Sequence, residues 1–422
     1  MNKKNVLIIG GGGREHAIVY SLSRSPKVGK IYCLPGNAGI AQLAECHSEY
    51  KATDLDGIVA FVRSHPDIYM TVVAPDDPLA MGLVDRLESE GFRAFGPRAN
   101  GARLEASKSF AKNLMKKYGI PTAGYEVFTD YDSARAYLDE CTYPTVLKAD
   151  GLALGKGVLI CETKEQAING LKEIMLDKAF GSAGNTLVIE DFLVGFECSA
   201  LAFCDGKTIV PMTTSQDHKR ALNDNKGLNT GGMATFSPSY KVSADMEKRI
   251  YAEVLKPTLD ALIGEGIEFK GVLYAGLMIN GDEIKVLEYN ARFGDPETQV
   301  ILPRLKTDLF DIFEACIDGT LADLNIEWTG NTAVCIILAS GGYPEAYEKG
   351  KEITFGVTDE GVIVFHAGTA EKDGKIVTSG GRVLGVTALA PTLKQARDLS
   401  YANVKNITFD KVHYRTDILK EL

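Results

Sequence analysis

The first hundred residues repeat one unit, a short apolar strand followed by a Gly- or Pro-rich turn and a helix. Strands are predicted at residues 5–9, 31–34 and 69–73, and the turns after them are residues 10–13, 35–39 and 74–78. Helices are predicted from Ala17 onward and over residues 58–63 and 79–90. Strands that alternate with helices in this way form a doubly wound parallel sheet, which binds ligands at the carboxyl ends of its strands. The chain is therefore expected to begin with an α/β domain that carries part of a binding site.

The first turn resembles a dinucleotide-binding fingerprint but departs from it. Gly10 and Gly12 fit the spacing, whereas Glu15 stands where the third glycine belongs. The second strand ends in Leu34-Pro35, without the acid that would hold a ribose hydroxyl. The backbone amides of residues 11–13, at a helix start beside Arg14, could instead cradle a single phosphate. The alternative is that these glycines serve only sheet–helix packing.

Composition narrows the class of protein. A chain of 422 residues is too long for one core, so two to four domains are expected. The 46 basic and 56 acidic residues give a net charge of −10, which argues against a general binder of nucleic acid or anionic membranes. No segment has the length of a secretory signal core or a membrane span. The 8 cysteines show no metal-binding or disulfide pattern, so a cytoplasmic protein with reduced thiols is expected, and we expect it to be a monomer.

The middle of the chain carries two lysine-bearing elements. A helix is predicted over residues 104–118, and a solvated face is the default interpretation of its lysines, Lys108 and Lys112 among them. The glycine-rich hairpin from Lys148 to Lys156 is no Walker loop, because Gly151 and Gly155 are too close together and strands flank it on both sides. It suits a mobile flap over a polyphosphate, and an ordinary hairpin is the alternative.

A strand at residues 187–190 then turns through residues 191–197, where backbone groups would be free for an adenine and acids for ribose hydroxyls. The polar loop 215–220 would, on its own, be a solvated loop, although loops of this length in compact domains are usually functional.

A strand predicted over residues 283–289 ends in the most informative stretch. Glu288 and Asn290 lie two residues apart and therefore share one face, where their oxygens suit a hard cation such as Mg²⁺. Arg292 follows with a fork of donors for a carboxylate or phosphate, and Gly294 and Pro296 turn the chain. The alternative for this stretch alone is a solvated strand end.

The last hundred residues read as a small α+β domain beyond a boundary near residues 322–330. Its predicted strands are residues 333–338, 362–366 and 382–386, and its predicted helix is residues 393–404. Its glycine turns, residues 340–344 and 379–382, are interpreted mainly as structural.

Taken in order, these pieces resemble the ATP-grasp superfamily and, within it, the phosphoribosylamine–glycine ligase family, over nearly the whole chain. The motifs that carry the resemblance are Arg14-Glu-His16, Pro35-Gly-Asn37-Ala-Gly39, Lys148-Ala-Asp-Gly151, Ser215-Gln-Asp217-His-Lys219-Arg220, Asn229-Thr-Gly-Gly-Met233, Tyr274-Ala-Gly276, Arg292-Phe-Gly294-Asp-Pro-Glu297 and Phe365-His366. The loop 215–220 and the turn 292–297 are its specific parts. The chain departs from the family at Asp76-Asp77, which replace Glu-Ala, and at Asp191, which replaces a glutamate.

The resemblance implies three domains: an N-terminal α/β domain over residues 1–103, an ATP-grasp domain over 104–326 with a mobile lid at about 122–192, and a C-terminal α+β domain over 327–422. It implies ATP-dependent ligation of glycine to 5-phosphoribosylamine, which gives glycinamide ribonucleotide, ADP and phosphate through glycyl phosphate in de novo purine biosynthesis. Mg²⁺ or Mn²⁺ would accompany ATP, and the partners would be the small-molecule substrates.

The resemblance also implies a role for each site residue. Glu288 and Asn290 would bind metal, and Arg292, Asp217 and Lys219 would be catalytic. The ATP-binding residues would be Lys108, Lys148, Gly151, Lys156, Glu190, Phe192, Val194 and Glu197. The substrate-binding residues would be Gly12, Gly13, Arg14, Asn37, Asp217, Arg292, Gly294 and Glu297.

Three other functions remain as alternatives. A carboxylase-type ATP-grasp ligase would activate bicarbonate in place of glycine. A nucleotide-binding regulator would bind ATP without turnover, which the Glu288–Asn290 pair argues against. A dinucleotide oxidoreductase is weakened by Glu15 and by the missing ribose acid.

Overall fold

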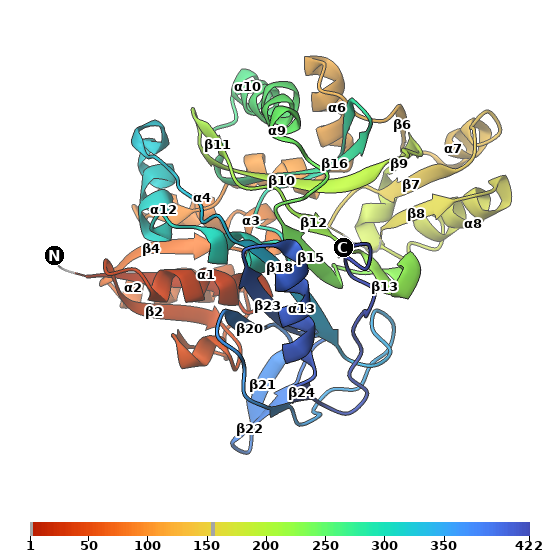
Figure 1. Cartoon of the computed structure of the whole chain (residues 1–422). Helices are drawn as coiled ribbons and strands as arrows, with labels where there is room; N and C mark the ends of the chain where they lie inside the picture. Colours follow the sequence, from red (N-terminus) through yellow and green to blue (C-terminus); the bar gives the residue numbers. More distant parts are fainter. Residues whose placement is uncertain (1–2, 153–156) are drawn as a thin grey trace.

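The chain begins with a five-stranded parallel sheet in the order β3-β2-β1-β4-β5, as seen in a computed structural model that describes residues 3–152 and 157–422 (Figure 1). The strands are β1 (Lys4–Gly10), β2 (Val28–Pro35), β3 (Glu45–Cys46), β4 (Ile68–Val73) and β5 (Ala94–Phe95). The order reverses beside β1, so the turns after β1, β2 and β4 open at one edge of the sheet. The predicted doubly wound sheet is confirmed.

Helices cover both faces of this sheet. They are α1 (Gly13–Ser23), α2 (Leu55–Ser64), α3 (Asp76–Ala80), α4 (Leu83–Ser89) and α5 (Ala99–Ala106), with a short turn η1 (Ile40–Gln42). The single helix predicted over residues 79–90 is wrong, because Gly82 adopts a left-handed φ of 85° and separates α3 from α4.

A second helix is also broken. The helix predicted over residues 104–118 is α5 followed by α6 (Lys108–Tyr118). Ser107 between them has extended backbone and accepts a hydrogen bond from the Phe110 amide as the N-cap of α6. Asp150 accepts hydrogen bonds from both Ser107 and Ser109, so this break is fixed to the hairpin that carries Lys148.

The predicted lid contains a four-stranded antiparallel sheet with its own small core, at the right of Figure 1. Its elements are β6 (Tyr125–Phe128), β7 (Thr145–Ala149), β8 (Val158–Cys161), β9 (Leu187–Asp191), α7 (Tyr131–Tyr137), α8 (Lys164–Met175) and η2 (Gly181–Asn185). Leu147, Leu171 and Ile174 are completely buried in this core.

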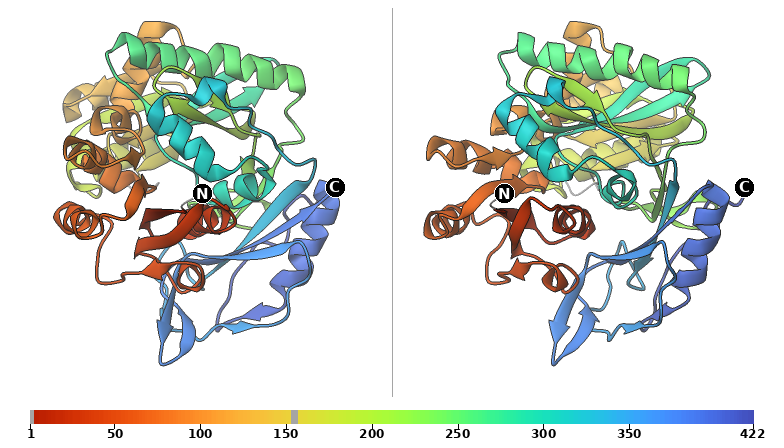
Figure 2. Two further views of the ribbon diagram at one scale, coloured as in Figure 1. Left: turned by 90° about the vertical axis from the view of Figure 1, so that its left-hand side faces the viewer. Right: turned by 60° about the vertical axis from the view of Figure 1, so that its left-hand side comes forward.

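The central sheet runs β11-β10-β16-β17 and is antiparallel. Its strands are β10 (Phe196–Asp205), β11 (Ile209–Pro211), β16 (Lys270–Asn280) and β17 (Glu283–Asn290). Figure 2 shows the long helical segment α9 (Ala244–Ile250), η4 (Tyr251–Leu255) and α10 (Lys256–Gly264), in green, lying over one face of this sheet. Leu259 and Leu262 of α10 share a core with Leu273 and Leu277 of β16. The helix α12 (Leu309–Asp318) packs on the opposite face, beside Phe203.

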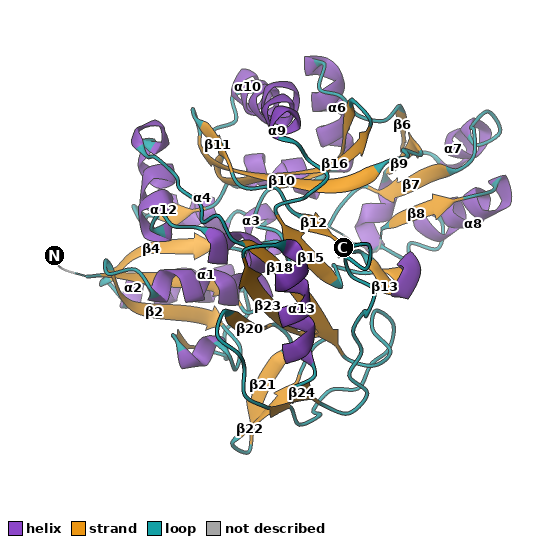
Figure 3. Ribbon diagram, in the orientation of Figure 1, coloured by secondary structure: helices purple, strands orange, loops and turns teal. Residues whose placement is uncertain are grey.

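The last sheet runs β12-β15-β18-β23-β20 and carries the helix α13 (Leu393–Val404) on one face (Figure 3). Its strands are β12 (Gln216–Asp217), β15 (Ala234–Ser237), β18 (Thr332–Ala339), β23 (Arg382–Ala390) and β20 (Val362–His366). Two of these strands come from the polar loop region rather than from the last hundred residues. The sheet therefore joins the loop that carries Asp217 to the C-terminal part of the chain.

Short elements connect these sheets. They are the hairpins β13 (Arg220–Leu222) with β14 (Lys226–Asn229) and β21 (Thr369–Lys372) with β22 (Lys375–Thr378), the pair β19 (Thr354–Phe355) with β24 (Ile407–Thr408), and the helical turns α11 (Thr298–Ile301), η3 (Asn223–Asn225), η5 (Leu302–Arg304) and η6 (Leu321–Asp323). All eight cysteines are free, six of them buried. Within residues 3–152 and 157–422, no helix is long and apolar enough to cross a membrane.

Candidate active site

The strand β17 contains a β-bulge that turns Glu288 and Asn290 away from the core. Val286 pairs with Leu277 and Glu288 pairs with Gly276, so Leu287 is an extra residue between two adjacent partners. Ile284 and Val286 face the core before the bulge, and Tyr289 does so after it. Glu288 and Asn290 are both partly buried and share the other face, as the alternation of a strand requires.

Basic side chains converge on Glu288. Lys219 Nζ lies 3.7 Å from its carboxylate and 3.2 Å from the carboxylate of Glu197. Burial would raise the pKa of the Glu288 carboxyl, but the charges of Lys219, Lys148 and Lys108 outweigh it and leave that pKa below its usual value. Glu288 is therefore an ionised carboxylate inside a ring of cations.

The predicted phosphate-binding lysines belong to this ring. Lys148 donates to the carbonyl of Leu287 at 3.0 Å, and Lys108 donates to the carbonyl of Gly151 at 3.0 Å. Both contacts use backbone acceptors, so the ammonium charges are held in place without being neutralised by those bonds. Lys156 lies outside the described residues.

The predicted adenine edge lies between β9 and β10. Glu190 is buried in β9, one residue before the strand ends at Asp191, whereas Phe192 and Val194 are exposed apolar residues on the connecting turn. Glu197 is the second residue of β10, and its carboxylate binds Lys219. The flat face of an adenine base can pack against exposed apolar side chains of this kind beside a strand end.

Arg292 is held by an acid that sequence reasoning missed. Its guanidinium lies 2.6 Å from the carboxylate of Glu105, which also accepts a hydrogen bond from the Ala291 amide. Arg292 donates to Asn290 Oδ1 at 3.1 Å as well, while its buried Nε has no partner among the described residues. Glu105 lies on α5, 187 positions earlier in the chain, so no local spacing could have paired it with Arg292.

Asp217 and Glu297 form an acidic group beside Lys219. Burial raises the pKa of Asp217, and the negative charges of Glu297 and Glu197 raise it further, whereas the positive charge of Lys219 lowers it, which leaves this pKa at about 7. Glu297 is only 3% exposed and accepts hydrogen bonds from Tyr274 at 2.7 Å and Ser199 at 3.3 Å. A side chain at Gly294 would lie 2.3 Å from Glu297, so this glycine permits the close packing of the turn.

The glycine turn after β1 is occupied largely by its own protein contacts. The Gly12 amide donates to Glu15 Oε2 at 2.6 Å, and a side chain at Gly13 would meet Gln299. Glu15 also binds Arg14 at 2.6 Å. These contacts favour the packing role for the glycines, which the sequence left open. Arg14 remains the basic group at this turn, and it also donates to the Phe293 carbonyl.

Asn37 joins the turn after β2 to two other parts of the chain. Its amide nitrogen donates to the carbonyls of Gly11 and His366, and its oxygen accepts from the amides of Gly39 and Ile40. Its polar atoms are thus engaged in holding the loop, next to the predicted sugar-phosphate region.

Arg382 is a second residue that sequence reasoning missed. It donates to the carbonyls of Gly231 at 2.5 Å and Asp295 at 2.8 Å, and it lies 3.5 Å from the Asp295 carboxylate. The sequence assigned it to a structural glycine turn, and no charge pattern near it pointed to a site 87 positions away.

The side chains present fit a divalent cation bound with nucleotide. Glu288 and Asn290 offer carboxylate and amide oxygens on one strand face, the ligand types that Mg²⁺ and Mn²⁺ prefer. Over the described residues, no group of three or more His, Cys, Asp or Glu side chains forms a complete cage. A cation here would need phosphate oxygens and water to complete its shell.

Three family descriptions match the chain in order. They are the phosphoribosylglycinamide synthetase N domain over residues 4–105, its ATP-grasp (A) domain over residues 106–298 and its C domain over residues 333–421. The phosphoribosylamine–glycine ligase of Caldanaerobacter subterraneus subsp. tengcongensis is 47% identical over 98% of this chain and 99% of its own length. The chain belongs to the phosphoribosylamine–glycine ligase family.

Two further relatives agree with this assignment. A crystal structure of phosphoribosylamine–glycine ligase from Thermotoga maritima matches with a TM-score of 0.86 and 35% identity, over 98% of this chain and 99% of that one. The trifunctional purine biosynthetic protein adenosine-3 of Gallus gallus is 47% identical over 98% of this chain but only 42% of its own length. The protein is thus an ATP-dependent ligase that forms glycinamide ribonucleotide in purine biosynthesis, and the predicted family and reaction are confirmed.

Biotin carboxylases share the fold of this ligase but little of its sequence. The enzyme from Campylobacter jejuni aligns with a TM-score of 0.75 at 12% identity, over 98% of this chain and 93% of that one. Such a likeness shows the ATP-grasp architecture alone, so it does not favour the bicarbonate-activating alternative.

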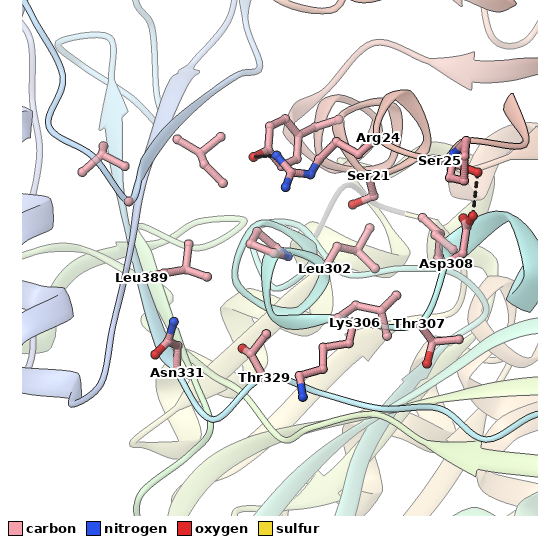
Figure 4. A pocket seen from close by; sticks show the side chains of 18 residues that line it. Ser21, Arg24, Ser25, Leu302, Lys306, Thr307, Asp308, Thr329, Asn331 and Leu389 are labelled. Atoms are coloured by element: carbon pink, nitrogen blue, oxygen red, sulfur yellow. Dashed lines mark hydrogen bonds between the residues drawn. The ribbon is translucent and has the colours of Figure 1, made fainter. Parts of the chain in front are cut away.

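A pocket of about 650 Å³ opens between the end of α1 and residues 302–309 (Figure 4). Arg24 and Ser25 at the end of α1 face Lys306 and Thr329 across it, and Ser25 donates to Asp308 at 2.7 Å. None of the predicted site residues that the structure describes lines this pocket. The active site of the ligase is therefore better located by its charged residues than by the volume of a cavity.

Proposed function

We propose that the ligase works through glycyl phosphate, with the cations around Glu288 assembling the two anionic reactants. A glycine carboxylate oxygen attacks the γ-phosphorus of ATP, and the bond to ADP breaks. The amine of phosphoribosylamine then attacks the carbonyl carbon of glycyl phosphate and loses a proton as phosphate leaves. Lys219 lies 3.7 Å from the Glu288 carboxylate, Lys148 binds the adjacent Leu287 carbonyl, and their charges with that of Lys108 lower the pKa of Glu288. This group of cations supports the proposal, because two anions must meet before the phosphorus–oxygen bond can form.

The roles of the nucleotide-binding residues follow from their positions. Lys108 and Lys148 face the ATP phosphates, and Gly151 and Lys156 are assigned to ATP with them because the sequence resemblance implies it. Phe192 and Val194 contact the base, and Glu190 and Glu197 lie on either side of that turn. Glu288 and Asn290 would hold Mg²⁺ or Mn²⁺, which would reduce the negative charge of the phosphates when bound.

The remaining residues are assigned to glycine and phosphoribosylamine. Arg292, fixed by Glu105, binds the glycine carboxylate, with Gly294 shaping the turn behind it. Asp217 and Glu297 receive the amino groups, for which acidic side chains are suited, and the Lys219 ammonium helps to attract the reacting anions. Gly12, Gly13, Arg14 and Asn37 line the region for the sugar phosphate, and Arg14 supplies the charge there.

The overall organisation is proposed in the same way. Residues 1–103, 104–326 and 327–422 are separate domains, and residues 122–192 move as a lid over ATP. The ligase is a cytoplasmic monomer whose partners are its small-molecule substrates, with neither nucleic acid nor membrane among them; the net charge of −10 supports this view.

Isotope transfer tests the intermediate. The ligase is supplied with ATP, phosphoribosylamine and glycine whose carboxyl oxygens are both ¹⁸O, and the released phosphate is analysed by mass spectrometry. Glycyl phosphate requires that each phosphate carry one ¹⁸O atom taken from glycine. Phosphate without ¹⁸O would overturn the proposal, and phosphate release with bicarbonate in place of glycine would support a carboxylase instead.

A further inference from the structure

Lys112 is a buried cation for which the proposed mechanism has no role so far. It lies on α6, one helical turn after Lys108, and its side chain is only 2% exposed. A solvated lysine was expected here, and that expectation is wrong. Buried lysines are rare unless they are paired, and Lys112 Nζ lies 2.8 Å from Glu190 Oε2 and donates to Thr122 Oγ1 at 2.8 Å.

Glu190 is shared between two lysines. Its second carboxylate oxygen, Oε1, lies 3.0 Å from Lys148 Nζ, and the Glu190 side chain is 3% exposed. Lys148 donates in turn to the Leu287 carbonyl on the bulge of β17. The three side chains form a buried cluster that carries two positive charges and one negative charge.

The charge of Lys112 changes how strongly Lys148 can attract a phosphate. If Glu190 faced Lys148 alone, the two would form a neutral pair, and little of the Lys148 charge would act on a phosphate. With Lys112 on the other oxygen, the cluster keeps a net positive charge in a site of low dielectric, where such a charge interacts strongly.

We propose that Lys112 is a positioning residue for ATP. Lys112 shares the charge of Glu190, so Glu190 can hold the Lys148 ammonium at Leu287 without cancelling the attraction of Lys148 for the phosphates. This inference rests on the proposed role of Lys148 in binding ATP. It also assigns the Glu190 carboxylate to holding Lys148, rather than to direct contact with a ribose.

The same helix offers a matched control. Lys116 lies one turn further along α6, and its Nζ is 5.6 Å from the centre of the Tyr125 ring, against 5.8 Å for Lys112. Lys116 is exposed and has no ion-pair partner among the described residues. Replacing either lysine removes a charge at a similar distance from the same ring, but only Lys112 shares Glu190.

Steady-state kinetics of the full-length ligase test the proposal. Lys112→Gln and Lys112→Met should each raise the KM for ATP by at least about ten-fold and leave the KM for glycine unchanged. Lys116→Met should change either KM by less than about two-fold. Lys112→Gln can still donate a hydrogen bond to Thr122, so it decides the outcome if Lys112→Met does not fold.

A Glu190→Gln background separates the proposal from a merely structural role. Without the carboxylate there is no charge to share, so adding Lys112→Gln to Glu190→Gln should not raise the KM for ATP any further. A structural role predicts the same increase in both backgrounds, and that result would overturn the proposal. Formation of glycinamide ribonucleotide by the native ligase is measured alongside, so a failure of the proposed function is seen separately.

Discussion

Lys148 donates a hydrogen bond to the carbonyl oxygen of Leu287, the residue that bulges out of β17, at a distance of 3.0 Å. The bulge thus has two consequences at once. It turns Glu288 and Asn290 to the face away from the core, and it presents a free carbonyl to a lysine from β7 in the predicted lid. In a regular strand, the alternation of side chains would bring Glu288 to the face of Val286, toward the core.

Glu288→Gln tests the metal assignment that follows from this geometry. Loss of the carboxylate charge should lower kcat on the order of 10²-fold and raise the Mg²⁺ concentration needed for half-maximal rate. Glu283→Gln, at the exposed start of the same strand, is the control and should behave like the native ligase. Activity of Glu288→Gln within a few-fold of native would show that Glu288 is not a metal ligand.

Most of the architecture could be predicted because it depends on local signals. The glycine turns after β1, β2 and β4 and the repeated succession of strand and helix predicted the N-terminal sheet, and β20 and α13 have the predicted bounds. The breaks at Gly82 and Ser107 were missed because they depend on a backbone conformation and on a cap, and a hydrophobic pattern continues across both.

The candidate site was harder to predict where its parts are brought together by tertiary packing. Asn290 and Arg292 were found from their spacing in the sequence, but Glu105 and Arg382 come from distant helices and strands. Lys112 had a usable signal, since its position four residues after Lys108 places both lysines on one helix face. What the sequence could not show is that this face is buried by β9.

Glu105→Gln should weaken the binding of glycine without removing any group that touches it. The neutral amide no longer holds the Arg292 guanidinium with a charge, and a charge-assisted hydrogen bond of this kind contributes about 1.5–3 kcal/mol, so we expect the KM for glycine to rise about ten-fold. Initial rates at varied glycine and saturating ATP measure this change.

The exposed pair Arg63–Glu90 provides the control for Glu105→Gln. Its ion pair is 2.7 Å long, like that of Glu105, but it lies on the surface. Glu90→Gln should alter the KM for glycine by less than about two-fold, because exposed pairs contribute little. An equal response of the two variants would mean that Glu105 does not position Arg292.

Asp217 predicts a distinctive dependence of stability on pH. Its folded pKa of about 7 lies above the unfolded value of about 3.9, so the native state binds the extra proton between these two values. Stability from this group is therefore lost as pH rises from about 4 to about 7 and stays constant above that window. Asp217→Asn cannot ionise at this position and does not lose this stability. The urea midpoint of the variant minus that of the native ligase should therefore increase as pH rises across this range.

Urea unfolding at several pH values between about 5 and 8 checks this prediction. Asp245→Asn, at the exposed start of α9, should show a constant difference from the native ligase. If the difference in urea midpoint between Asp217→Asn and the native ligase stays constant or falls as pH rises, Asp217 is ionised throughout this range. The Asp217 carboxyl would then carry no proton near neutral pH.

Arg382→Met tests whether the C-terminal part of the chain shapes the site for the sugar phosphate. Arg382 holds Asp295 and the Gly231 carbonyl, and Asp295 also lies near Arg14. Without Arg382, the largely buried Asp295 carboxylate turns to Arg14, and the loss of such a pair costs about 3 kcal/mol. We expect a lower unfolding temperature and a KM for phosphoribosylamine raised about ten-fold, with the KM for ATP unchanged because Lys108 and Lys148 do not contact this region. Arg397→Met is the comparison, since Arg397 likewise binds a backbone carbonyl, of Leu419, and a carboxylate, of Asp398, but within the C-terminal region itself. It should lower the unfolding temperature without changing either KM. If the two variants gave the same KM values, Arg382 would be a structural tie between sheets, and Arg14 would hold the sugar phosphate without its help.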